Sequence, residues 1–139
     1  TRLARVGYDN CVGYVKDGMQ AWIAAGEPVE TIESVTAESI ADKIDSLPIL
    51  DVRKPGEYEA EHVENALNIP LDTVNESFQS VPKGADFFLH CAGGYRSVIM
   101  ASILKSRGIH NLINVEKGMN GIKQTKVNCT QFVCPSTKK

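Results

Sequence analysis

The residues best suited to chemistry form one short block, residues 90–97, in which a cysteine is followed by two glycines and an arginine. Glycines permit a turn whose backbone N–H groups point inward and surround an anion. A helix that starts directly after such a turn adds the positive end of its dipole, and Arg96 adds a full charge. Both effects lower the pKa of a thiol, so we expect Cys91 to be a thiolate nucleophile rather than an inert buried cysteine.

The rest of this block would surround whatever is bound to the Cys91 sulfur. We predict that the substrate-binding residues are Ala92, Gly93, Gly94, Tyr95, Arg96 and Ser97. Tyr95 is expected to face solvent or to rim the pocket. Side chains alternate along a strand, so His90 should point away from Cys91, which makes it a poor candidate for a general base.

The other cysteines and the histidines give no metal-binding pattern. Cys129 and Cys134 lie five positions apart near the C-terminus, where a local disulfide, half of a metal site and two free thiols are alternatives. We favour free thiols. The three histidines lack the paired spacing of zinc motifs, so no metal is predicted.

Short apolar runs alternate with helical segments from about residue 31 onward. The expected strands are 48–52, 65–69, 87–89 and 112–115. The expected helices are a segment capped by Thr36 that runs through Ile44, residues 97–107 ended by Gly108, and a short helix opened by Gly118. This order predicts an α/β fold with a central parallel sheet, helices on both faces, and Cys91 at the carboxyl end of a strand.

Two blocks of the sequence resemble the rhodanese family. The active loop of that family, Cys-x-x-Gly-x-Arg-Ser, is matched by Cys91, Gly94, Arg96 and Ser97. Residues 51–70 resemble the family's Asp-x-Arg, Glu-Tyr, Gly-His-Ile, Gly-Ala and Asn-Ile-Pro signature. The departures are Glu61 and Asn65, where the family usually has glycine, and Ile122, where it often has tryptophan.

The resemblance covers about residues 34–124 and implies a sulfurtransferase. It implies a persulfide on Cys91, which accepts sulfur from a small-molecule donor such as thiosulfate or a persulfide and passes it to a thiol or cyanide acceptor. It implies no cofactor besides this covalent persulfide. Asp51 and Arg53 lie at the end of a neighbouring strand, and we expect them to support the structure rather than to react.

Two other functions were weighed against this one. Some protein phosphatases use a His-Cys-x5-Arg loop, but only four residues separate Cys91 from Arg96, and no carboxylate follows in an obvious general-acid position. Rhodanese-like modules can also be non-catalytic docking or regulatory domains. Those usually lack the cysteine, so the complete loop around Cys91 favours an enzyme.

The N-terminal residues repeat the end of the main domain. The aligned positions are Leu3, Gly7, Asn10 and Gly18-Met19 with Leu104, Gly108, Asn111 and Gly118-Met119. Chance similarity is the alternative, but we favour a truncated duplicate, with a strand at residues 11–15 and a helix after it. The predicted divisions are a remnant of a preceding rhodanese-like unit at 1–30, a rhodanese-like domain at 31–126, and a C-terminal tail at 127–139.

Half a domain cannot bury its own apolar face, so residues 1–30 are expected to pack on the main body or to form a homodimer. Such a remnant resembles the repeat that follows a metallo-β-lactamase-type hydrolase in fusion proteins, which suggests a larger multidomain protein. The net charge of -2 argues against a nucleic-acid partner. No apolar run reaches the length of a membrane span and no signal peptide is evident, so we expect no membrane association and a cytoplasmic location.

Overall fold

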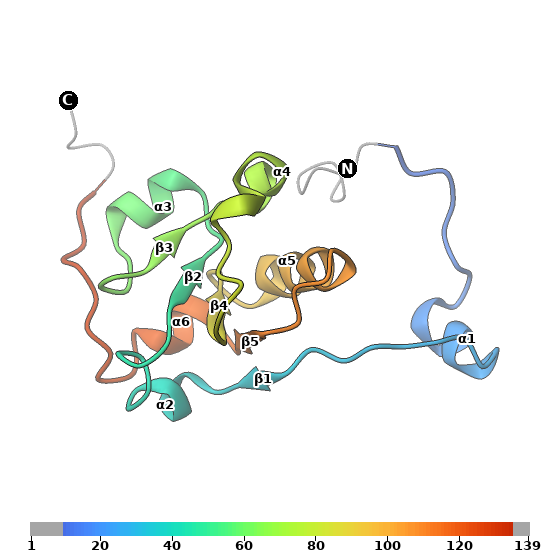
Figure 1. Ribbon diagram of the computed structural model, residues 1–139, viewed down its shortest axis with the longest axis horizontal. Coiled ribbons are helices and arrows are strands. Elements are labelled where there is room, and N and C mark those ends of the chain that lie inside the picture. Colours follow the sequence, from blue (N-terminus) through green and yellow to red (C-terminus); the bar gives the residue numbers. More distant parts are fainter. Residues whose placement is uncertain (1–9, 135–139) are drawn as a thin grey trace. The chain divides into compact units, whose positions relative to one another are not determined.

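The chain divides into two units, and the larger one begins at Ile32. Five short strands form one parallel sheet in this larger unit. The computed structural model describes residues 10–134. The strand order is β1-β5-β4-β2-β3, so β4 is central (Figure 1). The strands are β1 (Ser34–Val35), β2 (Ile49–Asp51), β3 (Leu67–Asn68), β4 (Phe87–His90) and β5 (Leu112–Val115). Every strand pair is parallel, as the sequence predicts.

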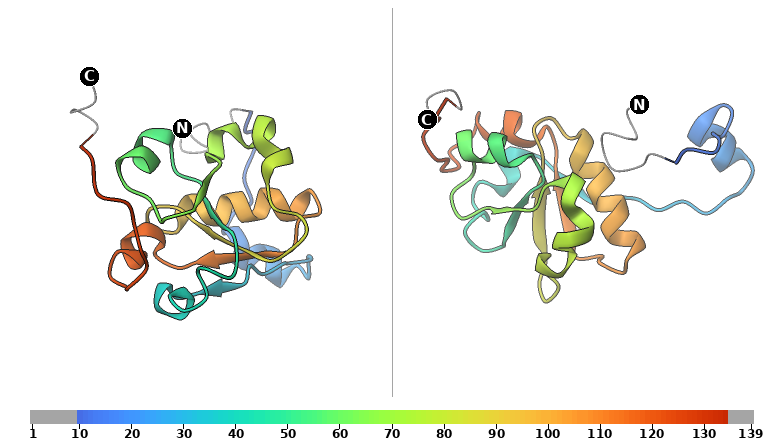
Figure 2. Two further views of the ribbon diagram at one scale, coloured as in Figure 1. Left: turned by 60° about the vertical axis from the view of Figure 1, so that its left-hand side comes forward. Right: turned by 90° about the horizontal axis from the view of Figure 1, so that it is seen from above.

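Helices cover both faces of this sheet, as Figure 2 shows. One face carries α2 (Ala37–Ile40) and α6 (Gly118–Ile122), and the other carries α4 (Val74–Ser77) and α5 (Tyr95–Ser106). The short helix α3 (Pro55–Ala60) follows β2. The predicted α/β fold, with a central parallel sheet and helices on both faces, is therefore confirmed.

The core lies on both sides of the strands because their side chains alternate. Ile49 and Phe88 belong to the cluster beneath α2 and α6. Their neighbours Leu50, Phe87 and Leu89 are also completely buried, on the opposite face. The central strand is thus buried on both sides, and only its carboxyl end can carry an accessible site.

Element boundaries differ most from the sequence-based prediction in two places. Thr36 caps α2 as predicted, since its Oγ1 accepts a bond from the Ser39 amide at 3.3 Å, but the helix ends at Ile40 and turns follow. The strand predicted at 65–69 shortens to β3, because Asn65 has a positive φ of 65°. Asparagine tolerates this left-handed conformation, which explains how it replaces the family's glycine.

The other two departures from the family pattern also have structural explanations. Glu61 has an extended backbone, with φ -166° and ψ 133°, so no glycine is required there. Ile122 is completely buried in the cluster beneath α6. It fills the position with an aliphatic side chain instead of an indole.

The first unit, described over residues 10–31, contains helix α1 (Gly18–Ala24). The strand predicted at residues 11–15 is wrong, since these residues form no strand. Residues 10–15 are exposed, and an extended segment needs a neighbouring strand to bond its backbone. Leu3 and Gly7 of the predicted repeat lie outside the described residues.

The start of α1 nevertheless has the same backbone conformation as the start of α6. Asp17 and Gly18 have φ values of 63° and 61°, and the aligned Lys117 and Gly118 have 59° and 50°. Two consecutive left-handed residues are uncommon in a chain of L-amino acids. The internal repeat is therefore visible in this part of the backbone, and its origin as a truncated domain stays a prediction.

Residues 127–134, here called the C-terminal strap, lie beside the segment that follows α3. The Glu64 amide donates to the Asn128 carbonyl at 3.0 Å, the Thr130 amide to His62 at 2.8 Å, and the Val133 amide to Ala60 at 2.8 Å. Val63 and Cys129 form an antiparallel bridge.

Within the described residues, no helix is long and apolar enough to cross a membrane.

Candidate active site

Cys91 is the first residue after the central strand β4, at the carboxyl edge of the sheet. The chain leaves β2 toward β3 on one side and leaves β4 toward β5 on the other. This reversal of direction opens a crevice in which ligands of open parallel sheets bind. Residues 91–94 form the loop, Gly94 has a φ of 107°, and α5 begins at Tyr95. The sequence elements predicted around Cys91 are therefore assembled at one edge.

The Cys91 thiol is surrounded by hydrogen-bond donors. Its side chain is only 1% exposed. The Gly94 amide donates to Sγ at 3.1 Å, and the Ser97 hydroxyl oxygen lies 3.6 Å from Sγ. Ionisation of the thiol would let the Ser97 hydroxyl donate to the sulfur.

The balance of these contacts favours the thiolate. Burial raises the pKa of the Cys91 thiol, but hydrogen bonds from the Ser97 hydroxyl and from the amides of Ser97, Gly94 and Gly93 outweigh it, and the pKa lies below its ordinary value. The helix dipole of α5, a helix of 12 residues, acts in the same direction. The pKa of Cys91 is therefore lowered by neutral hydrogen-bond donors, whereas the sequence suggested that the charge of Arg96 would lower it.

Arg96 is held by the carboxylate of Glu57, which was not among the site residues predicted from the sequence. Its Nη1 and Nη2 donate to the two oxygens of Glu57 at 2.6 and 2.9 Å. The hydrogen bond from Arg96 holds the pKa of Glu57 below its usual range. This bidentate pair joins the start of α5 to α3 and fixes the direction of the guanidinium. Arg96 therefore brings little net charge to the loop.

The back of the loop is fastened to α6. The Met119 amide donates to the Cys91 carbonyl at 2.7 Å, and the Asn120 amide donates to the Ala92 carbonyl at 3.0 Å. A Cβ on Gly118 would lie only 2.1 Å from the Cys91 carbonyl oxygen. Only glycine allows α6 to approach this closely, and the approach determines how the Cys91 peptide is oriented.

The predicted supporting residues form a buried pair beside the loop. Arg53 Nη2 lies 2.7 Å from Asp51 Oδ2, and the same nitrogen donates to the Glu61 carbonyl at 2.7 Å. The Asn68 amide group donates to the Asp51 and Arg53 carbonyls at 3.0 and 2.9 Å. These bonds connect β2 to β3 and to the end of α3, and Arg53 also lines a cavity.

His90 contacts the backbone of Cys91, not its sulfur. Its Nδ1 lies 3.1 Å from the Cys91 carbonyl oxygen, and its Nε2 lies 3.8 Å from Asp51 Oδ2. Burial lowers the pKa of His90 and outweighs the nearby carboxylate, so the ring is neutral. This geometry agrees with its exclusion as a general base for the thiol.

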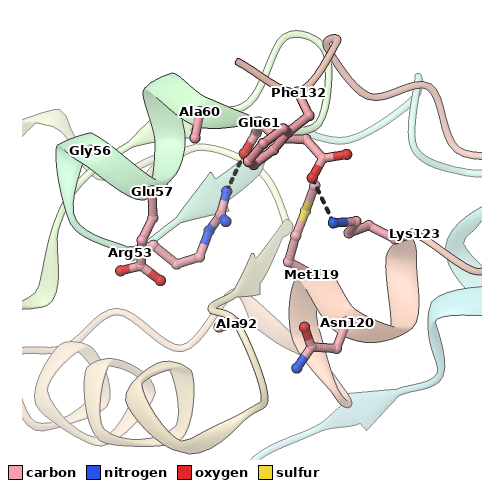
Figure 3. A pocket seen from close by; sticks show the side chains of 10 residues that line it. All are labelled: Arg53, Gly56, Glu57, Ala60, Glu61, Ala92, Met119, Asn120, Lys123 and Phe132. Carbon is pink, nitrogen blue, oxygen red and sulfur yellow. Dashed lines mark hydrogen bonds and ion pairs between the residues drawn. The ribbon is translucent and has the colours of Figure 1, made fainter. Parts of the chain in front are cut away.

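An open cavity of about 420 Å³ lies next to the loop (Figure 3). Ala92 lines it from the loop and Arg53 from the segment between β2 and α3, while the other lining residues come from α3, from α6, from the residues that end these helices, and from the strap. They are Arg53, Gly56, Glu57, Ala60, Glu61, Ala92, Met119, Asn120, Lys123 and Phe132. Tyr95 is 63% exposed and is not among them.

The charged groups around this cavity neutralise one another in pairs. Lys123 Nζ lies 2.7 Å from Glu61 Oε2, Arg53 is bound to Asp51, and Arg96 is bound to Glu57.

Among residues 10–134, no group of three or more histidine, cysteine, aspartate or glutamate side chains could hold a metal ion.

Most residues of the cavity wall were not among the site residues predicted from the sequence. Glu57 lies in the matched Glu-Tyr block, so that block was the signal for it. Met119 belongs to the repeated Gly118-Met119 segment, which was interpreted only as evidence of duplication, and Asn120 follows that segment. Phe132 lies in the segment predicted as a tail, and no sequence pattern connects it to Cys91.

Comparison with known proteins agrees with this architecture. The chain is 33% identical over 98 residues to the putative sulfur carrier protein YrkF of Bacillus subtilis, covering 68% of this chain and 53% of that protein. A tRNA sulfurtransferase of Thermoplasma acidophilum is 37% identical over 62 residues, which is 44% of this chain and 12% of that one. The chain thus spans about half or less of the curated relatives that it matches.

A solved structure and a family model cover the same part of the chain. The crystal structure of a rhodanese-like domain protein from Staphylococcus aureus superimposes with a TM-score of 0.61 at 32% identity, covering 66% of this chain and 91% of that one. The model of the rhodanese-like domain matches residues 36–125. The chain therefore belongs to the rhodanese-like domain family.

Proposed function

We propose that this chain is a sulfurtransferase that carries a persulfide on Cys91. The observation that carries the proposal is a buried thiol whose sulfur accepts the Gly94 amide at 3.1 Å, and whose pKa, although burial raises it, is lowered by the Ser97 hydroxyl and by the amides of Ser97, Gly94 and Gly93. A thiolate in this position is a nucleophile toward the outer sulfur of a donor. The same amides would bind the terminal sulfur of a Cys91 persulfide anion.

The reaction proceeds in two steps. The Cys91 thiolate attacks the sulfane sulfur of the donor, a new S–S bond forms, and the bond within the donor breaks. The donor remnant leaves with that electron pair, as sulfite from thiosulfate or as a thiolate from a persulfide. A thiol or cyanide then attacks the outer sulfur, and the Cys91 thiolate leaves unchanged.

The surroundings of Cys91 favour this chemistry over the two alternatives. A docking module needs no activated thiol, yet the Cys91 sulfur accepts the Gly94 amide at 3.1 Å. A phosphatase needs a loop that surrounds a phosphoryl group with donors, whereas both terminal nitrogens of the Arg96 guanidinium already donate to Glu57. Two of the relatives are named as a putative sulfur carrier and as a sulfurtransferase, which supports the same choice.

Cyanide-dependent turnover of thiosulfate tests the proposal. The Cys91→Ser variant should be folded and inactive, because serine cannot hold a sulfane sulfur. Cys11→Ser and Cys129→Ser serve as matched controls and should keep wild-type turnover, since Cys11 is exposed in the other unit and burial raises the pKa of Cys129. Turnover by Cys91→Ser, or release of phosphate from aryl phosphates that depends on Cys91, would overturn the proposal.

A further inference from the structure

The C-terminal strap lies beyond the part of the chain that the family shares, yet it forms one wall of the cavity beside Cys91. The family match ends at residue 125, and the strap begins at Val127. Phe132 of the strap lines the same cavity as Ala92 of the loop. The strap therefore contributes to the site from outside the residues that the family model matches.

The strap is held in place along its length rather than only at one end. Val127 is buried against the core beneath α6, and Cys129 packs against the same cluster. The Thr130 amide donates to the His62 carbonyl, and the His62 amide donates back to Thr130 Oγ1 at 3.0 Å. The Val133 amide donates to the carbonyl of Ala60, which lines the cavity. Phe132 therefore lies beside the cavity between Thr130 and Val133, whose backbone amides are both hydrogen-bonded.

Phe132 gives this wall an apolar surface that faces the open cavity. Its side chain is 65% exposed, an unusual position for a phenyl ring that serves only packing. Figure 3 shows the ring of Phe132 and the side chain of Met119 approaching from the strap and from α6. Met119 is only 3% exposed, so the Phe132 ring provides most of this apolar surface, and an aromatic ring binds apolar groups well.

The charges of the cavity offer little to a small inorganic dianion. Arg53 and Lys123, which line the cavity, and Arg96, whose partner Glu57 lines it, are each bound to a carboxylate. A dianion would have to compete with Asp51, Glu57 and Glu61 for these cations. The favourable unoccupied surface is apolar.

We propose that the strap makes this site selective for sulfane-sulfur donors that carry an apolar organic group, and that Phe132 is the selecting residue. The inference rests on the proposed sulfurtransferase function. The organic group lies against Phe132 while the sulfane sulfur reaches Cys91. Phe132 touches only the non-reacting part of the donor and takes no part in bond breaking.

Two donors with the same reacting sulfur test this selectivity. Benzenethiosulfonate and thiosulfate both transfer a sulfane sulfur to the Cys91 thiolate, and they release benzenesulfinate and sulfite with the electron pair of the broken bond. Benzenethiosulfonate carries a phenyl group and thiosulfate carries none. The ratio of their kcat/KM values, measured with cyanide as acceptor on the full chain, reports recognition of that group.

The Phe132→Ala variant should lower kcat/KM for benzenethiosulfonate by about tenfold, the effect of removing a hydrophobic contact from a pocket. The rate with thiosulfate should stay within about twofold, since the side chain is largely exposed and its loss leaves the fold intact. Phe132→Leu should keep most of the preference. Tyr14→Ala removes an exposed aromatic side chain from the other unit and should change neither rate.

Equal losses with both donors, or no loss with benzenethiosulfonate, would overturn the selective role of Phe132 while the sulfurtransferase function stands. Thermal unfolding of each variant separates loss of structure from loss of recognition. A wild-type chain that transfers sulfur from neither donor would instead overturn the proposed function, and this inference with it.

Discussion

Replacing Gly118 by alanine should damage both the stability of the domain and the active loop. Gly118 has a φ of 50°, and a left-handed backbone costs alanine roughly 1–2 kcal/mol. The added Cβ would lie 2.1 Å from the Cys91 carbonyl oxygen and 2.8 Å from its carbon, so α6 and the loop must separate by roughly an ångström. That movement weakens the bonds from the Met119 and Asn120 amides, each a contribution of roughly 1 kcal/mol.

These effects together predict a loss of about 3–5 kcal/mol in the free energy of unfolding, measured by urea denaturation. Gly108→Ala is the matched control, because Gly108 has a φ of 88° in the same domain but nothing within 4 Å of an added Cβ. That control should lose only the backbone cost, roughly 1–2 kcal/mol.

Activity should also fall more in Gly118→Ala than in Gly108→Ala. Displacement of the Cys91 peptide by roughly an ångström misdirects the thiolate, and turnover should fall by about a hundredfold in Gly118→Ala, with little change in Gly108→Ala. If the two variants lose equal stability and equal activity, the close contact between α6 and the loop has no special role and the reasoning is refuted.

Three other perturbations test separate parts of the site and of the chain. Ser97→Ala should raise the pKa of Cys91, because a hydrogen bond to the thiolate is lost; the thiolate absorbance and the acid limb of the turnover profile should then move to higher pH, and unchanged midpoints would count against this role. Arg96→Ala leaves the Glu57 carboxylate unpaired at the loop and should slow thiosulfate, a dianion, more than a monoanionic donor, whereas equal slowing would argue against an electrostatic effect. Light scattering should show a dimer for the whole chain and a monomer after removal of residues 1–30, because α1 exposes Met19 and Ile23; an unchanged oligomeric state would contradict the predicted interface.

The sequence predicted the sheet and its reactive edge because both depend on local signals. The apolar run before Cys91 identifies a buried strand, and the glycines after it identify a turn that ends in a helix. Thr36 as a helix cap and Gly108 as a helix end were readable for the same reason. Such features need only a few neighbouring residues.

Contacts between distant segments could not be predicted from the same information. Glu57 meets Arg96 across 39 positions, and residues 128–133 bond to residues 60–64 although no hydrophobic period marks them as a strand. The segment 11–15 has the composition of a strand, yet it finds no partner strand within residues 10–31. Pairing, and not propensity, decides whether such a segment forms a strand.

The role of Gly118 also could not be predicted from the sequence, because it depends on a tertiary contact. The sequence analysis noted Gly118-Met119 as a repeat of Gly18-Met19, and the backbone angles agree. An added Cβ meets Cys91 at Gly118, but nothing lies within 4 Å at Gly18. The same local motif therefore positions an active loop in one place and not in the other, and only the tertiary structure distinguishes them.

Intact mass spectrometry after treatment with thiosulfate tests the central claim most directly. We expect a gain equal to one sulfur atom on the wild-type chain, its removal by cyanide, and no gain on the Cys91→Ser variant. A gain that persists in Cys91→Ser, or a wild-type chain that takes up no sulfur, would contradict the assignment of a persulfide to Cys91.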